Sequence, residues 1–243
     1  MKIMLQNPKI LIDSLKFVSE LVSDICIKID RELVNISCLD NAKTMFFKID
    51  FSKDYFNEYE VDKPESLYLS GNQLYQVLNQ INNNPLEIMS DYNYVTIISY
   101  NSKGSYKKYK ITQINDYLND DVPIPAYNSQ HTAEINFKEF LSYLKDSTAF
   151  SEKVKLSFKD DTLLIEPDSE FTQYTSVMKL NEVISSEKLT SKFSLEKLMT
   201  LKAFNDMTYV EIGLDNDRPC TFQLKTDGFD FKILLAHMID IED

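Results

Sequence analysis

Residues 7–22 read NPKILIDSLKFVSELV, and residues 136–145 read NFKEFLSYLK. In both stretches the apolar side chains recur at steps of three or four residues, which is typical of one face of an amphipathic helix. The first helix is predicted to begin at residue 7, with Pro8 in the first turn, where a missing amide hydrogen is tolerated. A shift of 129 residues places Lys9 on Lys138. We therefore expect the same helix to occur twice.

Extended segments follow each predicted helix. Isoleucines at 25, 27 and 29 alternate with other residues, a turn follows at Asp30-Arg31-Glu32, and residues 33–39 complete a predicted hairpin. The same order returns in the second half, where a shift of 124 residues places Leu74 on Leu198. The sequence predicts an α+β fold built from a duplicated unit of helices and antiparallel sheet. The other expected elements are strands over 44–51, 65–69, 86–89 and 94–100 and a helix over 72–80.

A proline-containing segment separates the two halves. Val122-Pro123-Ile124-Pro125 carries prolines at alternating positions, which block a helix and remove ladder donors. We therefore predict an N-terminal domain over 1–111, an extended connector over 112–133 and a C-terminal domain over 134–243. The apolar Val122 and Ile124 either pack onto a domain or contact a partner, and the sequence leaves both open.

Composition argues against several classes of enzyme. The chain has 243 residues, a net charge of −12 and only four glycines, none spaced as a dinucleotide or phosphate loop. The two histidines stand alone, and the three cysteines form no CxxC pair and fit a reducing compartment with inert thiols. Acidic pairs such as Asp160-Asp161 fit no calcium loop, and no GxSxG elbow is present. We expect no catalytic site, no metal and no cofactor.

Nothing in the sequence indicates export or membrane insertion. The start of the chain lacks the features of a signal peptide, and no segment approaches the roughly 20 apolar residues of a membrane helix. A soluble intracellular protein is therefore expected, without a membrane partner. The net negative charge opposes wrapping of a polyanion around the outside, but it permits a locally basic inner face.

Four segments carry a resemblance to a known family. These are LDNAKTMF at 39–46, FSKDYFNEYE at 51–60, Arg218-Pro219 and LLAHMID at 234–240. Their order, the duplication and the length resemble the proliferating cell nuclear antigen family, the sliding clamps of archaea, eukaryotes and viruses. The resemblance implies a three-subunit ring whose helices line a hole for double-stranded DNA of any sequence. It also implies tethering of DNA polymerase, clamp loader, ligase and nuclease through short peptide motifs, with no bound cofactor, at the DNA of an archaeal cell, a nucleus or a viral factory.

The resemblance places lysines of the helices toward DNA. Seven residues separate the lysines within the first and third helices, so each pair lies on one helix face, opposite the leucine stripe. The second helix has glutamines and asparagines instead, and ordinary solvated lysines are the alternative interpretation. The candidate DNA-binding residues are Lys9, Lys16, Lys138, Lys145, Lys197 and Lys202.

The resemblance also implies a pocket under the connector for a peptide with a glutamine, an aliphatic residue and two aromatic residues. Here His237 stands where the family has proline, and Phe46 is larger than the usual aliphatic residue. The pocket residues carried over by position are Leu39, Asp40, Lys43, Phe46, Val122, Ile124, Pro219, Leu234, Ala236, His237 and Ile239.

Subunit contact in the family joins edge strands of neighbouring subunits. The candidate edges are residues 105–111 and 172–179. The lysines of the first segment could instead protect a free edge, and a homotrimer and a heterotrimer remain equally open. The candidate contact residues are Tyr106, Lys108, Lys110, Gln173, Thr175 and Val177.

Two other functions compete with a replication clamp. Catalysis has little support in the sequence. A clamp-like subunit of a checkpoint-type ring, or a viral processivity or transcription factor, is the stronger alternative, and binding to replication peptides would discriminate it from a replication clamp.

Overall fold

The structure is a computed structural model that describes residues 1–114, 125–171 and 173–239. Two compact units emerge, and each is described by itself. Of the described residues, unit 1 takes 1–43, 47–114 and 226–230, and unit 2 takes 44–46, 125–171, 173–225 and 231–239. The domain boundaries expected from the sequence stay a prediction.

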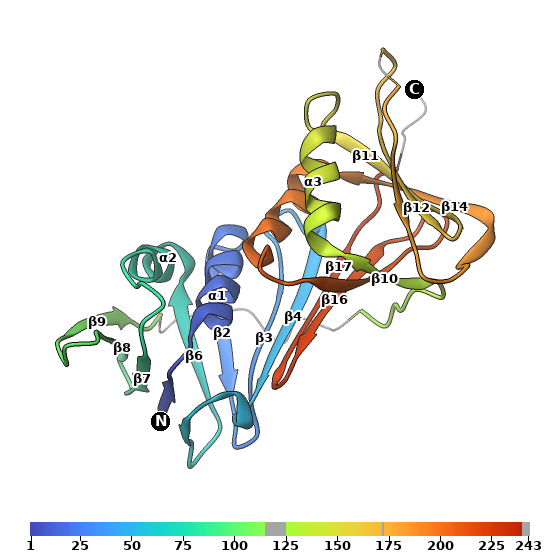
Figure 1. Cartoon of the computed structure of the whole chain (residues 1–243). Helices are drawn as coiled ribbons and strands as arrows, with labels where there is room; N and C mark the ends of the chain where they lie inside the picture. The colour runs from blue at the N-terminus through green and yellow to red at the C-terminus, as the bar shows by residue number, and fades with distance from the viewer. Residues whose placement is uncertain (115–124, 172, 240–243) are drawn as a thin grey trace. The chain divides into compact units, whose positions relative to one another are not determined.

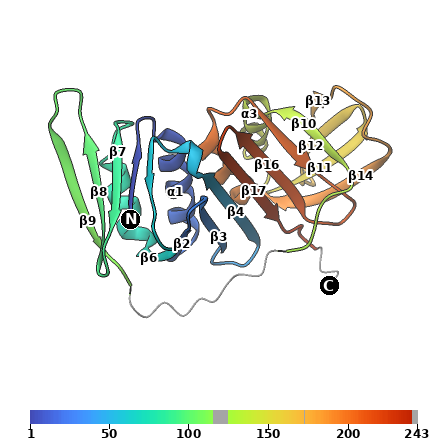
Figure 2. The same ribbon diagram turned by 90° about the horizontal axis from the view of Figure 1, so that it is seen from below.

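The first half of the chain alternates strands with two helices. The strands of unit 1 form two sheets, one in the order β5-β1-β7-β8-β9 and the other containing β4-β3-β2-β6. Figure 2 shows β8 and β9 side by side at the end of the first sheet. The elements are β1 (Lys2–Leu5), α1 (Lys9–Leu21), β2 (Asp24–Ile29), β3 (Leu33–Leu39), β4 (Met45–Ser52), the 3₁₀ turn η1 (Lys53–Tyr55), β5 (Glu58–Glu60), β6 (Glu65–Ser70), α2 (Gly71–Asn79), β7 (Leu86–Ser90), β8 (Tyr94–Tyr100) and β9 (Tyr106–Thr112).

The second half repeats this alternation. The strands of unit 2 contribute the orders β10-β15-β16-β17 and β13-β12-β11-β14. The elements are β10 (Thr132–Asn136), α3 (Phe137–Ser147), β11 (Lys153–Asp160), β12 (Thr162–Pro167), β13 (Ser176–Lys179), β14 (Ser185–Ser194), α4 (Leu195–Met199), the 3₁₀ helix η2 (Thr200–Phe204), β15 (Tyr209–Gly213), β16 (Cys220–Thr226) and β17 (Phe229–Leu235).

The strand pairing is duplicated along with the helices. β2 pairs with β3 and with β6, and β11 pairs with β12 and with β14 in the same antiparallel sense. Likewise β7 lies between β1 and β8, and β15 lies between β10 and β16. The predicted duplicated α+β fold is confirmed.

The helices form because their apolar faces can be buried. On α1 the buried face includes Leu11, Leu15 and Val18, which recur at the predicted helical spacing. In Figure 1, α1 and α2 lie side by side within unit 1, and α3 contacts α4 within unit 2. The Asn136 side chain accepts a hydrogen bond from the Glu139 amide at 3.1 Å and caps α3.

Two details of the helix prediction are wrong. The first helix begins at Lys9 rather than at residue 7, and Pro8 is the N-cap residue. The fourth helix is α-helical only over Leu195–Met199 and continues as a 3₁₀ helix, so Lys202 lies in η2. This short helix buries only Leu195 and Leu198. A 3₁₀ turn is common where an α-helix ends.

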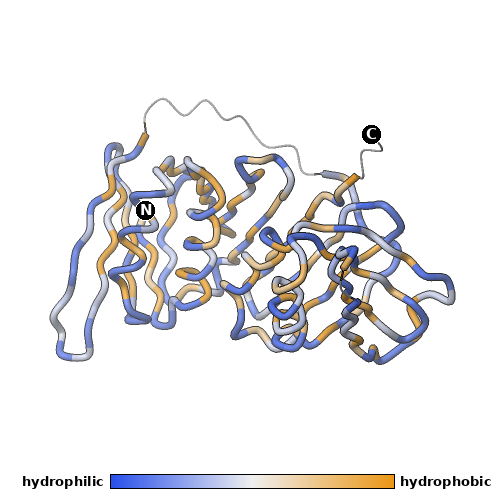
Figure 3. The backbone as a smooth tube through the Cα atoms, turned by 90° about the horizontal axis from the view of Figure 1, so that it is seen from above, coloured by the Kyte–Doolittle hydropathy of each residue, from blue (hydrophilic) through white to orange (hydrophobic). Residues whose placement is uncertain are grey.

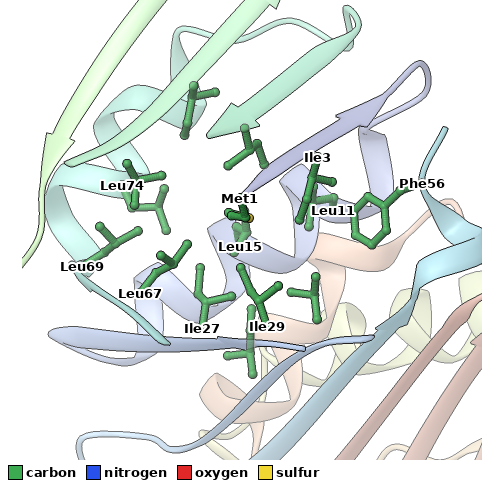
Figure 4. A pocket seen from close by; sticks show the side chains of 15 residues that line it. Met1, Ile3, Leu11, Leu15, Ile27, Ile29, Phe56, Leu67, Leu69 and Leu74 are labelled. Carbon is green, nitrogen blue, oxygen red and sulfur yellow. The ribbon is translucent and has the colours of Figure 1, made fainter. Parts of the chain in front are cut away.

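The core of unit 1 contains a small cavity lined by apolar side chains. Figure 4 shows Leu11 and Leu15 of α1 pointing toward Ile27 and Ile29 of β2, around a cavity of about 40 Å³. Leu74 of α2 closes another side. No polar surface lines this cavity, so it offers no partner to a polar group nearby.

One buried hydroxyl on α1 lacks a partner. Ser14 is fully buried, and its Oγ makes no hydrogen bond to any residue that the structure describes. We expect Ser14→Ala to raise the free energy of unfolding by about 1 kcal/mol, because an unsatisfied buried polar group is removed. Urea unfolding followed by circular dichroism measures the change.

The control for this prediction is Ser19→Ala on the same helix. The Ser19 Oγ donates to the Leu15 carbonyl oxygen at 2.7 Å, so its removal relieves no unsatisfied group. Both variants gain the same helix propensity, and only Ser14→Ala should be clearly more stable than wild type. An equal change in the two variants would contradict the burial argument.

Candidate DNA-facing helices, subunit edges and partner-binding residues

The two candidate lysines of α1 differ in how far they are neutralised. Lys9 Nζ lies 2.9 Å from Asp13 Oδ2, one helical turn away, and both side chains are partly exposed. Lys16 is also partly exposed and forms no ion pair with any described residue. Because Asp13 offsets the charge of Lys9, α1 contributes less positive charge than its sequence indicates.

On α3 the candidate lysines are free to meet an anion. Lys138 and Lys145 are exposed and form no ion pair within the part of the chain that the structure describes. The opposite face of the helix buries Phe140 and Leu144. The seven-residue spacing therefore works as predicted and keeps both ammonium groups on the solvent side.

The remaining helices differ in charge between the two units. The exposed positions of α2 include Gln73, Gln76 and Asn79, which carry no charge. In unit 2, Lys197 of α4 is partly exposed and Lys202 of η2 is exposed. The candidate lysines of unit 2 thus outnumber those of unit 1, and the neutral α2 face agrees with the sequence.

The first candidate edge is a free strand within the described residues. β9 is the terminal strand of its sheet, and its register pairs Tyr100 with Tyr106, Ile98 with Lys108 and Thr96 with Lys110. Tyr106, Lys108 and Lys110 therefore share one face of β9, and all three are exposed. Lys110 Nζ lies 5.2 Å from the centre of the Tyr94 ring. The turn before β9 is hydrophilic, as Figure 3 shows.

The second candidate edge is shorter than predicted. β13 covers only Ser176–Lys179 and is the terminal strand of its sheet, while Gln173 and Thr175 precede it and Thr172 lies outside the described residues. Val177 is 48% exposed on β13. Thr175 Oγ1 donates to Glu166 Oε1 at 3.3 Å, which holds this approach to the strand in place.

Two aromatic side chains stack near the start of β13, and a third aromatic side chain, two residues before Gln173, is exposed. The Phe150 ring stacks on Tyr174 with 5.2 Å between their centres, and Phe150 is 40% exposed. Phe171 is 95% exposed. Val177 alternates with the buried Ser176 and Met178, so it lies on the other face of β13, where its exposed apolar side chain could be covered by a paired strand from another chain.

Three of the predicted pocket residues form a turn in unit 1. Leu39 ends β3 and is 37% exposed, whereas Asp40 is buried. The amide of Lys43 donates to the Asp40 carbonyl oxygen at 2.9 Å, and Lys43 has a φ of 57°. The Asn41 amide donates to the Leu21 carbonyl oxygen at 3.1 Å, which ties the turn to the end of α1.

The other described pocket residues belong to unit 2. Phe46 is buried, so its ring belongs to the core, and Pro219 comes directly before β16. After β17, the Ala236 amide donates to the Thr44 carbonyl oxygen at 2.8 Å. Leu234 and His237 are partly exposed, and Ile239 is 77% exposed. Val122 and Ile124 lie outside the described residues.

Sequence reasoning missed an aspartate that organises the connector. In the sequence Asp215 is only part of an acidic stretch with Asn216 and Asp217, but its carboxylate accepts hydrogen bonds from Tyr127 Oη and His131 Nδ1, each at 2.7 Å. Neither the spacing nor the residue types linked Asp215 to residues more than 80 positions earlier. The acidic turn is the only signal in the sequence, and acidic residues at turns are usually solvated.

The described residues offer no metal centre. No group of three or more histidine, cysteine or acidic side chains comes together among them, and they contain no helix long and apolar enough to cross a membrane. Burial raises the pKa of the Cys38 thiol to about 12, with Cys26 adding to the effect. A thiol with so high a pKa is a poor nucleophile and metal ligand near neutral pH.

Comparison with known proteins gives one consistent match. Residues 1–118 match the family described as "Proliferating cell nuclear antigen, N-terminal domain". Over 242 residues the chain is 25% identical to a protein named DNA polymerase sliding clamp from Methanobrevibacter smithii, with 98% of each chain covered.

Solved structures give the same fold. The crystal structure of PCNA from Thermococcus kodakaraensis has a TM-score of 0.89 at 13% identity, covering 98% of this chain and 99% of that one. A. fulgidus PCNA bound to the C-terminal region of FEN-1 has a TM-score of 0.87 at 18% identity, covering 99% of both chains. With its duplicated sheets and paired helices, this chain has the fold of the proliferating cell nuclear antigen structures, its residues 1–118 match the model of that family, and nearly its whole length is similar to DNA polymerase sliding clamps.

Proposed function

We propose that this chain is a subunit of a ring that encircles double-stranded DNA and tethers replication and repair proteins to it. The observation that carries the proposal is the duplicated fold, in which each unit presents a pair of helices, together with similarity to DNA polymerase sliding clamps along nearly the whole chain. The role needs no catalytic group, and it places the protein at DNA inside the cell.

The DNA contact is proposed to be made by Lys16, Lys138, Lys145, Lys197 and Lys202, with Lys9 weakened by Asp13. Lysines that contact phosphates hold DNA without reading its sequence, and the attraction falls as salt rises. Such contacts allow the ring to slide. The acidic remainder of the chain keeps DNA away from other surfaces.

Ring closure is proposed to join β9 of one subunit to β13 of the next. Each is the terminal strand of its sheet within the described residues, and pairing would satisfy the open edge of both. Tyr106, Lys108 and Lys110 would contribute from β9, and Gln173, Thr175 and Val177 from the region of β13. Three subunits complete the ring, either three copies of this chain or this chain with related ones.

Partner proteins are proposed to bind through short peptides at the predicted pocket under the connector over 112–133. The solved complex of A. fulgidus PCNA with the C-terminal region of FEN-1, a nuclease, supports this. We extend the proposal to DNA polymerase, clamp loader and ligase. Among the described pocket residues, the partly or largely exposed Leu39, Leu234 and Ile239 offer the apolar contact.

A threading experiment tests the encircling role without a clamp loader. A short duplex carrying biotin at both ends is mixed with the protein, and streptavidin is added either before or after mixing. A ring that has passed over a free end is trapped when streptavidin comes second, and it then survives a wash in high salt. Equal release in both orders would show that the chain does not encircle DNA.

The pocket proposal predicts a large effect at Ile239. Because its side chain is 77% exposed, Ile239→Asp should leave the fold intact. We expect affinity for a synthetic peptide with a glutamine, an aliphatic residue and two aromatic residues to fall at least about tenfold, since a charge replaces an apolar contact. Fluorescence anisotropy of the labelled peptide measures it.

Val183→Asp is the matched control for Ile239→Asp. Val183 is 68% exposed in unit 2 and is not among the predicted pocket residues. Its replacement introduces the same charge and should leave peptide affinity unchanged. If both variants bind as wild type does, Ile239 does not belong to the pocket.

A further inference from the structure

The carboxylate of Asp215 gathers the end of the connector onto unit 2. Tyr127 Oη donates to Asp215 Oδ2 at 2.7 Å, and the Gln130 amide donates to the same oxygen at 3.0 Å. His131 Nδ1 lies 2.7 Å from Oδ1. Both carboxylate oxygens are therefore used, and the side chain is only 16% exposed.

The neighbouring residues of the connector are held as well. Ser129 Oγ lies 3.3 Å from Thr221 Oγ1 on β16, and Lys232 Nζ on β17 donates to Asn128 Oδ1 at 2.5 Å. The Leu214 amide donates to the His131 carbonyl oxygen at 3.0 Å. Each residue from 127 to 131 thus forms a hydrogen bond with β16, with β17 or with the turn after β15.

The packing around Gly213 leaves no room for a side chain at this position. A Cβ built on Gly213, directly before the turn, would come within 2.6 Å of the Ser129 side chain and 2.3 Å of Thr221 Oγ1. The approach of the connector to β15 therefore depends on glycine at this position. The connector end is packed against unit 2 and not merely tethered to it.

The anchor requires an ionised carboxylate. Burial alone would raise the pKa of Asp215, but the hydrogen bonds from His131, Tyr127 and the Gln130 amide outweigh it and hold the pKa below its usual value. Asparagine keeps only one acceptor oxygen, and its NH₂ group donates where the carboxylate accepted. An Asp215→Asn variant therefore loses the charge-assisted hydrogen bonds, and it retains a contact with His131 only if the imidazole changes to the tautomer whose Nδ1 accepts.

We propose that Asp215 is a positioning residue that holds residues 127–131 of the connector on unit 2 and thereby prepares the connector for partner peptides. This inference rests on the proposed function. A segment ordered before binding loses little conformational entropy when the peptide arrives, whereas a released segment must be ordered at that moment. Asp215 acts through the connector and has no assigned contact with the peptide.

The test compares two aspartate-to-asparagine changes in one turn. Asp215→Asn removes the anchor, and Asp217→Asn removes the same charge from an exposed side chain with a φ of 46°, which asparagine tolerates. We expect Asp215→Asn to weaken binding of the labelled peptide about tenfold, or ~1.4 kcal/mol. Asp217→Asn should stay within about twofold, or ~0.4 kcal/mol.

A second variant removes a donor instead of the acceptor. Tyr127→Phe deletes only the phenol hydroxyl, so it leaves the turn that carries Asp215 unchanged. We expect a smaller loss of peptide affinity, and the double variant should bind no more weakly than Asp215→Asn alone, because both changes break the same contact. Hydrogen exchange at the Gln130 amide should quicken in Asp215→Asn, while the solution mass of the assembly stays that of wild type.

Each outcome decides the question. Peptide binding by Asp215→Asn as tight as wild type overturns the anchor and leaves the proposed function standing. Failure of the wild-type chain to bind the peptide overturns the partner-binding part of the proposed function, and this inference with it. If Asp215→Asn does not fold, Tyr127→Phe decides, and wild-type affinity in that variant overturns the anchor.

Discussion

Reversing the charge of both lysines on α3 is expected to abolish most of the affinity for DNA. Lys138→Glu with Lys145→Glu replaces two exposed ammonium groups by carboxylates, and a ring of three subunits repeats the change in each. Log affinity falls with log salt concentration, and each lost phosphate contact makes this slope shallower by ~0.9. We therefore expect DNA binding to be at least about a hundredfold weaker at low salt. Anisotropy of a labelled duplex across a salt series measures both quantities.

The matched control reverses two lysines that do not lie on a helix. Lys153 and Lys159 are exposed on β11, and changing both to glutamate alters the net charge by the same amount. Their effect should be limited to the weak long-range repulsion of the added charge, which salt screens. An equal loss in both double variants would mean that net charge, and not the helix face, governs DNA binding.

Val177→Asp is expected to convert the ring to single subunits. Val177 is 48% exposed on β13, where we propose that the neighbouring β9 covers it. Burying an unpaired carboxylate there costs several kcal/mol, roughly a hundredfold or more in the affinity of each contact. Light scattering over a concentration series should give three times the chain mass of 28.3 kDa for wild type and the single mass for the variant.

Val183→Asp serves as the control for assembly too. It places the same charge at a 68% exposed position that follows β13 rather than lying on it. This variant should keep the wild-type mass. A Val177→Asp protein that remains trimeric would remove β13 from the subunit contact, and a wild-type chain that stays single at all concentrations would require different partner subunits.

The elements with a strong local pattern were predictable. The hairpin of β2 and β3, the strand β8 and the body of α1 agree with the sequence within two residues. Their apolar spacing follows from which side chains must face the core, and this spacing is visible over a dozen residues. The duplication was visible for the same reason, since both copies bury the same helix face.

Elements that depend on distant partners were missed. No strand is predicted before the first helix, yet β1 pairs with β5 and with β7, which lie more than 50 and 80 residues away in sequence. The three-residue β5 has no pattern of its own. Such strands form because a neighbouring strand offers hydrogen bonds, and the local sequence does not show which distant segment that neighbour is.

In the candidate sites, too, local features were predictable from the sequence and features that depend on the folded structure were not. Spacing alone predicted that Lys138 and Lys145 share a helix face, whereas the pairing of Lys9 with Asp13 depends on side-chain geometry. Phe46 was predicted to line a pocket, but the sheet buries its ring.

The sequence by itself determined the duplicated α+β fold and the lysine-bearing helix faces, because each follows from the order and spacing of neighbouring residues. Only the tertiary structure decided which strands end their sheets, which lysines remain unpaired and that Asp215 holds Tyr127 and His131. The physical reason is that hydrogen bonds and ion pairs form wherever folding brings donors and acceptors together. The spacing of residues along the chain does not show which distant groups will form such contacts.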